Sequence, residues 1–428
     1  MPVSVVWFRQ DLRLADHVPL QKAVQSGLPL AFVWVEDPRW SLQESLGFPR
    51  IGPHRRQFFA GCLAALDREL ERGGHALHVL RGEPAEVIPA WLERLGGGQV
   101  FAHREPGTEE AAQEAALERV LPVDWAWGKT LVDPADLPMP VTDLPRIFTD
   151  FRRKAEAVVG RSPVLPAPDL SAIPAAPLVP TEALAAWPVV GGAGSGGPGA
   201  GAQAQGRLVA YMADGGPIIR YRETRDALMG EDSSSRLSPW LASGTLSARE
   251  VNAALVAHEE RCGSSEHTKW FRMELLWRDF FQLVALQQGR RLFLRRGFAG
   301  RSTVASGAAS ETARARFDAW RAGTTGQPLV DAAMHELAAT GWLTNRARQL
   351  AAWYLARTLE VPWTWGARWF SSCLIDDDVA SNWGNWAYLA GVGNDPRPDR
   401  HFDLAWQTAR HDPDGAYRRA WGTWAEPG

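Results

Sequence analysis

The chain has 428 residues, of which 45% are apolar and 22% charged, and its formal net charge is -3. It is too long for one compact domain, and its charge argues against a protein that is coated with nucleic acid over its whole surface. No apolar run could span a membrane, no secretion signal opens the chain, and the three cysteines are widely spaced, so we expect a cytoplasmic protein.

Residues 1–130 alternate short apolar runs with amphipathic stretches. The predicted strands are residues 3–8, 30–35, 76–80 and 100–102, and the predicted helices are residues 52–72, 84–95 and 108–120. Strands and helices that alternate in this way predict an α/β domain built on a doubly wound parallel sheet.

Residues 131–202 are predicted to link two domains. Prolines recur every few positions from 133 to 188, which is typical of an extended connection over the surface. Further on, Gly192, Gly194 and Gly197 match the spacing of a dinucleotide-binding loop. Because no strand precedes them and no acidic residue follows at the required distance, we interpret the glycine run as part of the linker.

From residue 203 to 428 the apolar residues follow a helical period almost throughout, which predicts a larger all-α domain. Residues 201–428 contain 27 basic and 25 acidic side chains, against 19 and 24 in residues 1–200, and Lys269 is the only lysine among them. Arginine is the side chain best suited to bidentate phosphate contacts. We therefore expect an anionic partner here, although a GC-rich genome would also account for the arginines.

Three clusters of helical residues could carry chemistry. The first places a carboxylate, an indole and a guanidinium on one helix face: Glu274, Trp277, Arg278 and Phe281. The other two are polar faces among Trp and Leu: Asn345, Arg348 and Gln349, then Asp378, Asn382 and Trp386. An ordinary stripe of ion pairs would also account for the first cluster. The amides of the other two clusters, if buried, need hydrogen-bond partners that water cannot supply. A planar heterocycle with many hydrogen-bonding edges would supply them.

Two further segments each allow two interpretations. Asp376, Asp377 and Asp378 could collect Mg²⁺, but the preceding arginines favour pairing of the carboxylates with Arg348 and with a ligand. The serine run over residues 233–238 offers hydroxyl and backbone N–H groups to a phosphate, or it simply caps the helix that follows.

Several motifs, by their order and spacing, resemble those of the cryptochrome/photolyase family. They are residues 7–16, 234–239, 274–278, 325–331, 345–349 and 376–386. The resemblance covers nearly the whole chain. It implies an antenna-binding α/β domain that is followed by a helical domain for FAD and DNA.

The resemblance also implies which residues hold FAD. Those matching its phosphate and ribityl contacts are Tyr221, Arg225, Ser234, Ser235, Leu237 and Ser238, and those matching its other contacts are Glu274, Arg278, Arg348, Asp376, Asp378 and Asn382. Asn382 matches the position beside flavin N5. An asparagine there resembles the DNA-repair branch, because a neutral amide supports a reduced flavin without supplying a proton.

The reaction implied is that of a carbon–carbon lyase acting on DNA. Excited, fully reduced FAD donates an electron to a cyclobutane pyrimidine dimer flipped out of the stack, and the electron returns once the ring has split. Glu274, Asn345 and Gln349 would hydrogen-bond the dimer. Trp277 and Tyr388 would flank it by stacking.

Within the family, the chain is most similar to the cryptochrome-DASH branch. Gln349 and Tyr388 stand where cyclobutane-dimer photolyases usually have Met and Trp, and residues 391–395, Arg400 and Tyr417 resemble the DASH ending. Losing an indole weakens stacking on a base by roughly 1–3 kcal/mol. We therefore expect repair to favour single-stranded DNA, in which flipping a base costs less.

Two features depart from the family pattern. The resemblance implies a relay of three tryptophans that passes electrons to the flavin during photoreduction. Trp386 and Trp363 match its first two positions, but the third position is Ser310. Either Trp320 or Trp342 ends the relay instead, or photoreduction is weak. Glu105 matches a contact of a methenyltetrahydrofolate antenna. Because residues 47–56 lack the expected lysine-rich loop, an empty antenna site stays an alternative.

Two other functions stay open beside repair. One is a blue-light photoreceptor or regulator with little repair activity, and the other is an electron-transfer flavoprotein that does not bind DNA. Asn382, Glu274 and Trp277 favour the enzyme. No protein partner follows from the sequence, and we expect a monomer.

Overall fold

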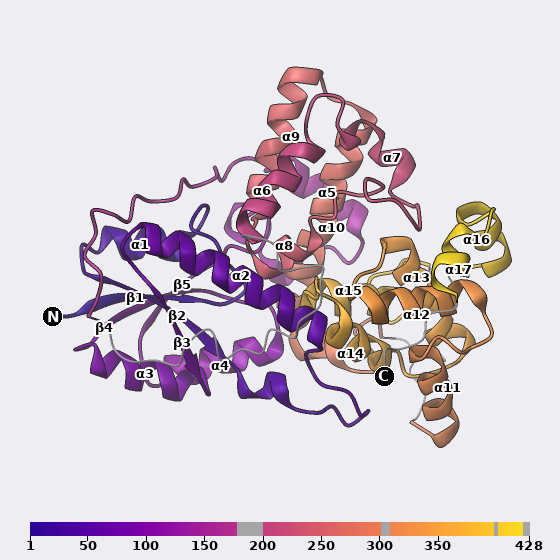
Figure 1. Cartoon of the computed structure of the whole chain (residues 1–428), viewed down its shortest axis with the longest axis horizontal. Coiled ribbons are helices and arrows are strands. Elements are labelled where there is room, and N and C mark those ends of the chain that lie inside the picture. Colours follow the sequence, from indigo (N-terminus) through magenta and orange to yellow (C-terminus); the bar gives the residue numbers. More distant parts are fainter. Residues whose placement is uncertain (178–199, 301–308, 398–400, 423–428) are drawn as a thin grey trace.

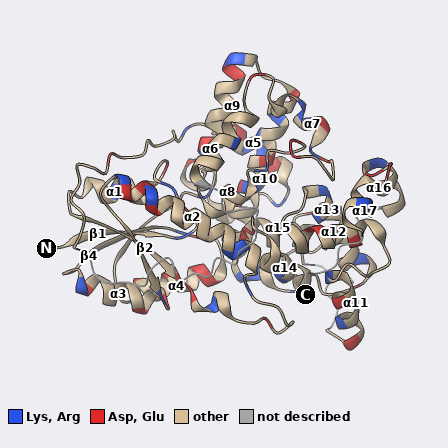
Figure 2. Ribbon diagram, in the orientation of Figure 1, with Lys and Arg blue, Asp and Glu red and all other residues tan. Residues whose placement is uncertain are grey.

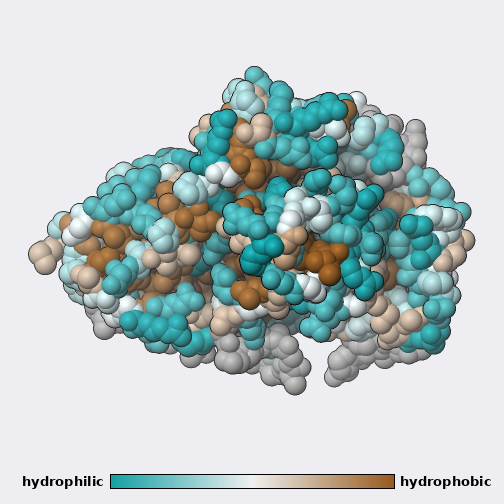
Figure 3. Space-filling model, turned by 90° about the horizontal axis from the view of Figure 1, so that it is seen from above, coloured by the Kyte–Doolittle hydropathy of each residue, from teal (hydrophilic) through white to brown (hydrophobic). Residues whose placement is uncertain are grey.

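The computed structural model describes residues 1–177, 200–300, 309–397 and 401–422, and in it an α/β domain is followed by a helical domain (Figure 1). The glycines at 192, 194 and 197, and Arg400, lie outside the described residues. Within the described ranges, no helix is both long and apolar enough to cross a membrane. The face drawn in Figure 3 is mainly hydrophilic, with small separate apolar patches.

Five parallel strands form one sheet in the order β3-β2-β1-β4-β5. They are β1 (Val3–Phe8), β2 (Leu30–Glu36), β3 (Leu77–Arg81), β4 (Gly98–His103) and β5 (Val123–Ala126). The sequence did not predict β5, a half-buried edge strand of four residues, or the short helix α1 (Val18–Gln25). Neither has an apolar run or a period long enough to recognise.

Helices cover both faces of the sheet (Figure 1). Helices α1 and α2 (Pro53–Arg72) pack on one face, against Val6 and Phe8, while α3 (Pro84–Arg94) and α4 (Thr108–Glu118) pack on the other, against Val5 and Trp7. Since alternate side chains of a strand point to opposite faces, a strand that is covered on both sides is apolar throughout. The predicted doubly wound α/β domain is confirmed.

The second domain is all-α, as predicted, and is built around two large apolar cores. Its helices are α6 (Ala200–Tyr211), α7 (Tyr221–Thr224), α8 (Ser238–Ser243), α9 (Ala248–Cys262), α10 (Glu266–Gln288), α11 (Glu311–Arg321), α12 (Pro328–Thr340), α13 (Asn345–Trp353), α14 (Trp363–Cys373), α15 (Val379–Leu389), α16 (Leu404–His411) and α17 (Ala416–Trp421).

The segment after residue 130 differs from the prediction of an extended surface connection. Helix α5 (Phe148–Glu156) interrupts it, and Phe148 and Phe151 pack against Phe280 of α10. Backbone N–H groups of Leu131 and Val132 donate to the carboxylate of Asp279, also on α10, at 2.9 Å each. The prediction is wrong over α5, because apolar residues at 148, 151 and 155 give this segment a buried helical face despite the prolines around it.

Candidate functional site

The helical domain contains a cavity with two adjoining compartments. We call them the inner compartment, of about 270 Å³, and the outer compartment, of about 580 Å³. Residues that line both include Tyr221, Arg225, Ser235, Leu237, Ser238, Glu274, Asn345, Arg348, Gln349, Asp376 and Asp378. Ser234, Asn382 and Trp386 line the inner one, and Trp277, Arg278 and Tyr388 the outer one. Residues predicted over a span of more than 160 positions therefore surround one cavity.

The three consecutive aspartates point to different partners. Asp376 pairs with Arg348 at 2.8 Å, and Asp377 pairs with Arg55 of α2 at 2.9 Å. Asp378 caps α15 through the backbone N–H of Ser381. The carboxylates therefore do not converge on one point, and the predicted pairing of Arg348 is observed. Burial raises the pKa of Asp377, and the charge of Arg55 opposes this shift only in part, so that the pKa is about 6.

Unpaired polar atoms at the cavity fit a ligand that is rich in hydrogen-bonding groups. Asp376 Oδ1 and Arg225 Nε are buried and have no hydrogen-bond partner among the described residues. The amide nitrogen of Asn382 donates to the Ala367 carbonyl at 2.9 Å and to Ser371 Oγ at 2.8 Å, which leaves its carbonyl oxygen as an acceptor. A flavin offers donors and acceptors along its edge, so these residues fit FAD.

The serine loop before α8 is held from behind by α6. Arg207 donates to the backbone carbonyls of Ser234 and Ser235 at 3.0 and 2.9 Å. The N-cap of α8 is Leu237, and no side chain caps this helix end. The capping interpretation of the serine run is therefore wrong, while the phosphate interpretation stays a prediction.

Glu274 and Arg225 form an ion pair where the two compartments meet. The distance from Arg225 Nη2 to Glu274 Oε1 is 2.7 Å. Burial raises the pKa of Glu274, although the charge of Arg225 opposes that shift. A carboxyl group with a raised pKa in a cavity can share or supply a proton, as the predicted role beside a pyrimidine carbonyl requires.

The two aromatic residues predicted to flank the substrate touch each other. The ring centroids of Trp277 and Tyr388 are 5.9 Å apart at an interplanar angle of 83°. Phe148 of α5 stacks on Trp277 with a centroid distance of 3.7 Å and an angle of 12°. One face of Trp277 is thus covered by a residue that the sequence analysis assigned to the linker.

Arg278 joins the domains as well as lining the outer compartment. Its guanidinium donates to the backbone carbonyls of Lys129 and Leu241. Burial alone would raise the pKa of Asp378, but the charges of Arg278 and Lys129 hold it below its usual value. Asp378 therefore stays ionised at the cavity wall.

Sequence reasoning missed Gln282, Arg207 and Phe148. Gln282 Nε2 donates to Asp378 Oδ1 at 2.6 Å from the middle of α10. A glutamine inside the apolar run from 280 to 285 was a usable signal, since a buried amide needs a partner. The helical spacing of residues 148, 151 and 155 was another. Arg207 gave no signal, because three of its hydrogen bonds go to backbone carbonyls, at Glu231, Ser234 and Ser235, and one goes to the side chain of Asp232.

Trp386 and Trp363, which the sequence predicts as members of an electron relay, are both buried. Trp386 is 2% exposed and lines the inner compartment. Trp363 is completely buried, and its Nε1 donates to the Arg295 carbonyl at 2.8 Å. Ser310, at the third position, is the N-cap of α11.

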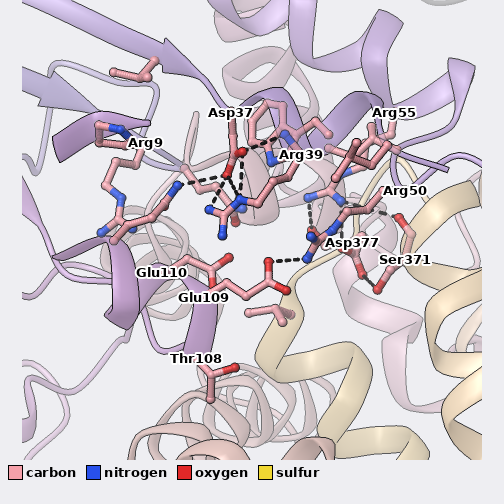
Figure 4. A pocket seen from close by; sticks show the side chains of 18 of the residues that line it. Arg9, Asp37, Arg39, Arg50, Arg55, Thr108, Glu109, Glu110, Ser371 and Asp377 are labelled. Atoms are coloured by element: carbon pink, nitrogen blue, oxygen red, sulfur yellow. Dashed lines mark hydrogen bonds and ion pairs between the residues drawn. The ribbon is translucent and has the colours of Figure 1, made fainter. Parts of the chain in front are cut away.

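A second pocket, of about 530 Å³, lies between the domains, at the carboxyl ends of β1 and β2 and against α14 and α15 (Figure 4). Ion pairs line it: Asp37 with Arg39, Glu109 with Arg50, and Asp377 with Arg55. We call it the interdomain pocket. Ligands of open α/β sheets bind at such strand ends.

Glu105, the predicted antenna contact, does not line the interdomain pocket. It is 5% exposed and pairs with Lys129 at 2.9 Å. Burial raises the pKa of Glu105, and the charge of Lys129 opposes this shift only in part, so that the pKa is about 7. The neighbouring Glu109 and Glu110 do line the pocket.

Two groups of residues of metal-ligand type are held by hydrogen bonds within the protein. Asp11, His17 and His103 lie close together and buried, but His17 Nδ1 accepts from the Leu20 N–H, so its Nε2 carries the proton and donates to Asp11. In the second group, of Asp214, His258 and Cys262, Arg261 occupies Asp214 Oδ1 at 3.0 Å.

Two family models match the chain. The model described as DNA photolyase matches residues 4–170, and the model described as the FAD binding domain of DNA photolyase matches residues 270–423. Together they cover both domains. The chain therefore belongs to the cryptochrome/photolyase family.

Within this family the relatives point to one branch. A cryptochrome DASH of Synechocystis is 40% identical over 98% of this chain and 87% of its own length, and one of Gloeobacter violaceus is 40% identical over 97% and 85%. A solved Synechocystis cryptochrome superposes with a TM-score of 0.91 at 38% identity, covering 98% of this chain and 88% of that one. The predicted similarity to cryptochrome DASH is confirmed.

A photolyase is also among the similar solved structures. A bacterial class III photolyase from Agrobacterium tumefaciens superposes with a TM-score of 0.84 at 28% identity, over 98% of this chain and 86% of that one. The likeness therefore reaches both photolyases and cryptochromes.

Proposed function

We propose that this protein is a cytoplasmic, monomeric photolyase that binds FAD in the inner compartment and repairs cyclobutane pyrimidine dimers under blue light. We further propose that it prefers single-stranded DNA. The observation that carries the proposal is the continuity of the cavity. The residues that suit a flavin line the inner compartment, except Arg278, and those that suit a pyrimidine dimer line the adjoining outer one.

A reduced FAD would supply the excited electron that splits the cyclobutane ring and would take it back afterwards. Side chains of the protein surround the site of this electron transfer and are held in place by their neighbours. Asn382 presents a carbonyl oxygen and no proton, because both its N–H bonds are used by Ala367 and Ser371. Glu274 is oriented by Arg225 and can hold a proton at a pyrimidine carbonyl, so charge developing on the dimer is stabilised.

The outer compartment also has the charges that a DNA backbone requires. Arginines that line it include Arg152, Arg225, Arg278, Arg348 and Arg397. Basic residues also stand on α13 and α16 (Figure 2). Contacts between arginine and phosphate release counterions, so affinity for DNA falls as salt rises.

Salt dependence distinguishes this proposal from an electron-transfer flavoprotein without DNA. We expect binding of a dimer-containing single strand to weaken steeply between about 50 and 200 mM salt. Fluorescence anisotropy with a labelled oligonucleotide measures it. An affinity that does not change with salt would leave no phosphate contacts and would contradict the DNA interface.

One observation favours a photoreceptor with little repair activity. Trp277 is covered on one face by Phe148 and is met by Tyr388, so a pyrimidine must displace an aromatic neighbour to stack on it. Illumination of the reduced protein with dimer-containing single strands and duplexes separates the two functions. Loss of dimers, faster in single strands, supports repair, and unchanged dimers in both would leave the photoreceptor.

We propose the interdomain pocket as the antenna site, with Glu109 and Glu110 as contacts in place of Glu105. Donors for a pterin or similar ring come from Arg9 and Gln10, which also line this pocket. The purified protein is expected to carry a second near-ultraviolet chromophore beside FAD. Substituting Glu109→Gln together with Glu110→Gln should release it, and retention of the chromophore would contradict this placement.

A further inference from the structure

The relay of the proposed photolyase lacks an aromatic residue at its third position. Ser310 caps α11 by accepting the Ala313 N–H at 3.1 Å, and it carries no oxidisable group. An electron that moves from the protein surface toward Trp386 must therefore enter at another side chain.

Trp342 and Trp320, the candidates from the sequence, are poor entry points. The guanidinium of Arg236 lies over the Trp342 ring, 4.3 Å from its centroid, and a positive charge there opposes oxidation of the indole. Trp320 contacts Trp386 at a centroid distance of 6.1 Å. It is completely buried, however, and its Nε1 is bonded to the Ala351 carbonyl, so it has no route for releasing a proton to water.

Trp383 stands beside both assigned relay residues. On α15 it precedes Trp386 by one turn, which places the two side chains on neighbouring parts of one helix face. Its ring centroid is 5.6 Å from that of Trp363, at an interplanar angle of 76°. Trp386 in turn packs on the α14 backbone at Gly366, one turn beyond Trp363. Three indoles thus gather where α14 meets α15.

Trp383 also reaches the interdomain pocket. It lines that pocket together with Phe293, whose ring centroid is 5.0 Å from its own. Neither Trp386 nor Trp363 lines it. When no antenna molecule is bound, the interdomain pocket is therefore the place where water and a small reductant can approach the cluster of indoles.

We propose that Trp383 replaces the missing third member of the relay, so that electrons enter the protein from the interdomain pocket. Trp386 gives one electron to the cofactor site, Trp363 refills Trp386, and Trp383 refills Trp363. Trp383, now short of one electron, releases its indole N–H proton to water in the pocket. A soluble thiol then returns a hydrogen atom to Trp383 and is itself oxidised, finally to a disulfide. This inference rests on the proposed FAD site.

The test compares two substitutions that fill similar space. In the full-length protein with bound, oxidised FAD and no antenna, the yield of the long-lived radical on an aromatic side chain after a blue flash is followed by transient absorbance and electron paramagnetic resonance, with no thiol added. Trp383→Phe, which is redox-inert, should lower this yield by about tenfold. Trp383→Tyr, whose ring can be oxidised, should restore part of it. FAD content and the thermal midpoint show whether each variant is folded.

Trp320→Phe and Trp406→Phe serve as controls, since Trp320 contacts Trp386 without reaching the pocket and Trp406 is 53% exposed on α16. Both should keep most of the radical yield. A folded Trp383→Phe protein with the wild-type yield, or a loss that appears in Trp320→Phe instead, would overturn the inference. The radical signal needs no DNA. Failure of chemically reduced wild-type protein to repair dimers would therefore contradict the proposed function without touching the relay.

Discussion

In the proposed function, Tyr388 and Trp277 determine what can enter the outer compartment. They meet nearly at right angles, and Phe148 already stacks on Trp277. A flipped base can therefore gain stacking chiefly by moving Tyr388, a smaller ring than the indole that photolyases usually present there. This favours substrates for which flipping is already cheap, such as single strands.

Tyr388→Ala should weaken binding of a dimer-containing single strand by roughly 1–3 kcal/mol, because it removes one stacking surface. Binding is measured by titration in the dark, so that no dimer is consumed. Tyr388→Phe is the matched control and should bind nearly as well as wild type, since the ring is kept. If the alanine variant also binds as well as wild type, Tyr388 does not contact the substrate.

Among the elements, α10 and α5 join the cavity to the rest of the molecule. Helix α10 supplies Glu274, Trp277 and Arg278 to the cavity, and Asp279 and Phe280 of the same helix hold the segment around α5. The position of Trp277 therefore depends on α5, a helix that lies outside the sequence motifs of the FAD site.

Phe148→Ala should lower the free energy of unfolding by about 3–5 kcal/mol, the usual cost of deleting a buried phenyl ring. It should also uncover one face of Trp277, and so tighten binding of dimer-containing DNA. Denaturant unfolding and dark titration measure the two effects. Phe148→Leu, which keeps most of the apolar volume, should lose less stability. Unchanged affinity in a folded Phe148→Ala protein would show that Phe148 does not compete with the substrate.

The cavity residues were predictable where helical spacing placed chemistry on one face and family motifs gave it a role. Glu274 and Arg278 on α10, and Asp378 and Asn382 at α15, are such cases. The contribution of α5 was hidden by the prolines around it. The pairing of Asp377 with Arg55 was hidden because it joins positions 322 apart in the chain, and only the docking of the domains brings them together.

At the scale of the whole molecule, buried carboxyl groups set the pH dependence of stability. Burial raises the pKa values of Glu105, Asp279 and Glu336 to about 7 and that of Asp377 to about 6. In the unfolded chain these groups titrate near pH 4. Between about pH 4 and 7 the folded protein therefore holds protons that the unfolded chain has released, so these groups make stability fall as pH rises.

The thermal midpoint should accordingly be higher at about pH 6 than at about pH 8 at constant ionic strength. Calorimetry over this range measures it. Glu336→Gln keeps an acceptor for the Tyr417 hydroxyl, which donates to Glu336 at 2.5 Å, and should flatten the dependence. A midpoint that rises steadily up to pH 8 would contradict the raised pKa values.

The most direct test of the repair proposal is the time course of dimer loss from a single-stranded oligonucleotide under blue light. The protein is used with bound FAD, chemically reduced beforehand, and is compared with a dark sample and with Glu274→Gln. We predict loss of dimers in the light alone, slowed by about tenfold in Glu274→Gln at equal FAD content, because the proton at the pyrimidine carbonyl is less available. Dimers that persist in the illuminated wild-type sample, or that disappear equally in the dark, would contradict light-driven repair.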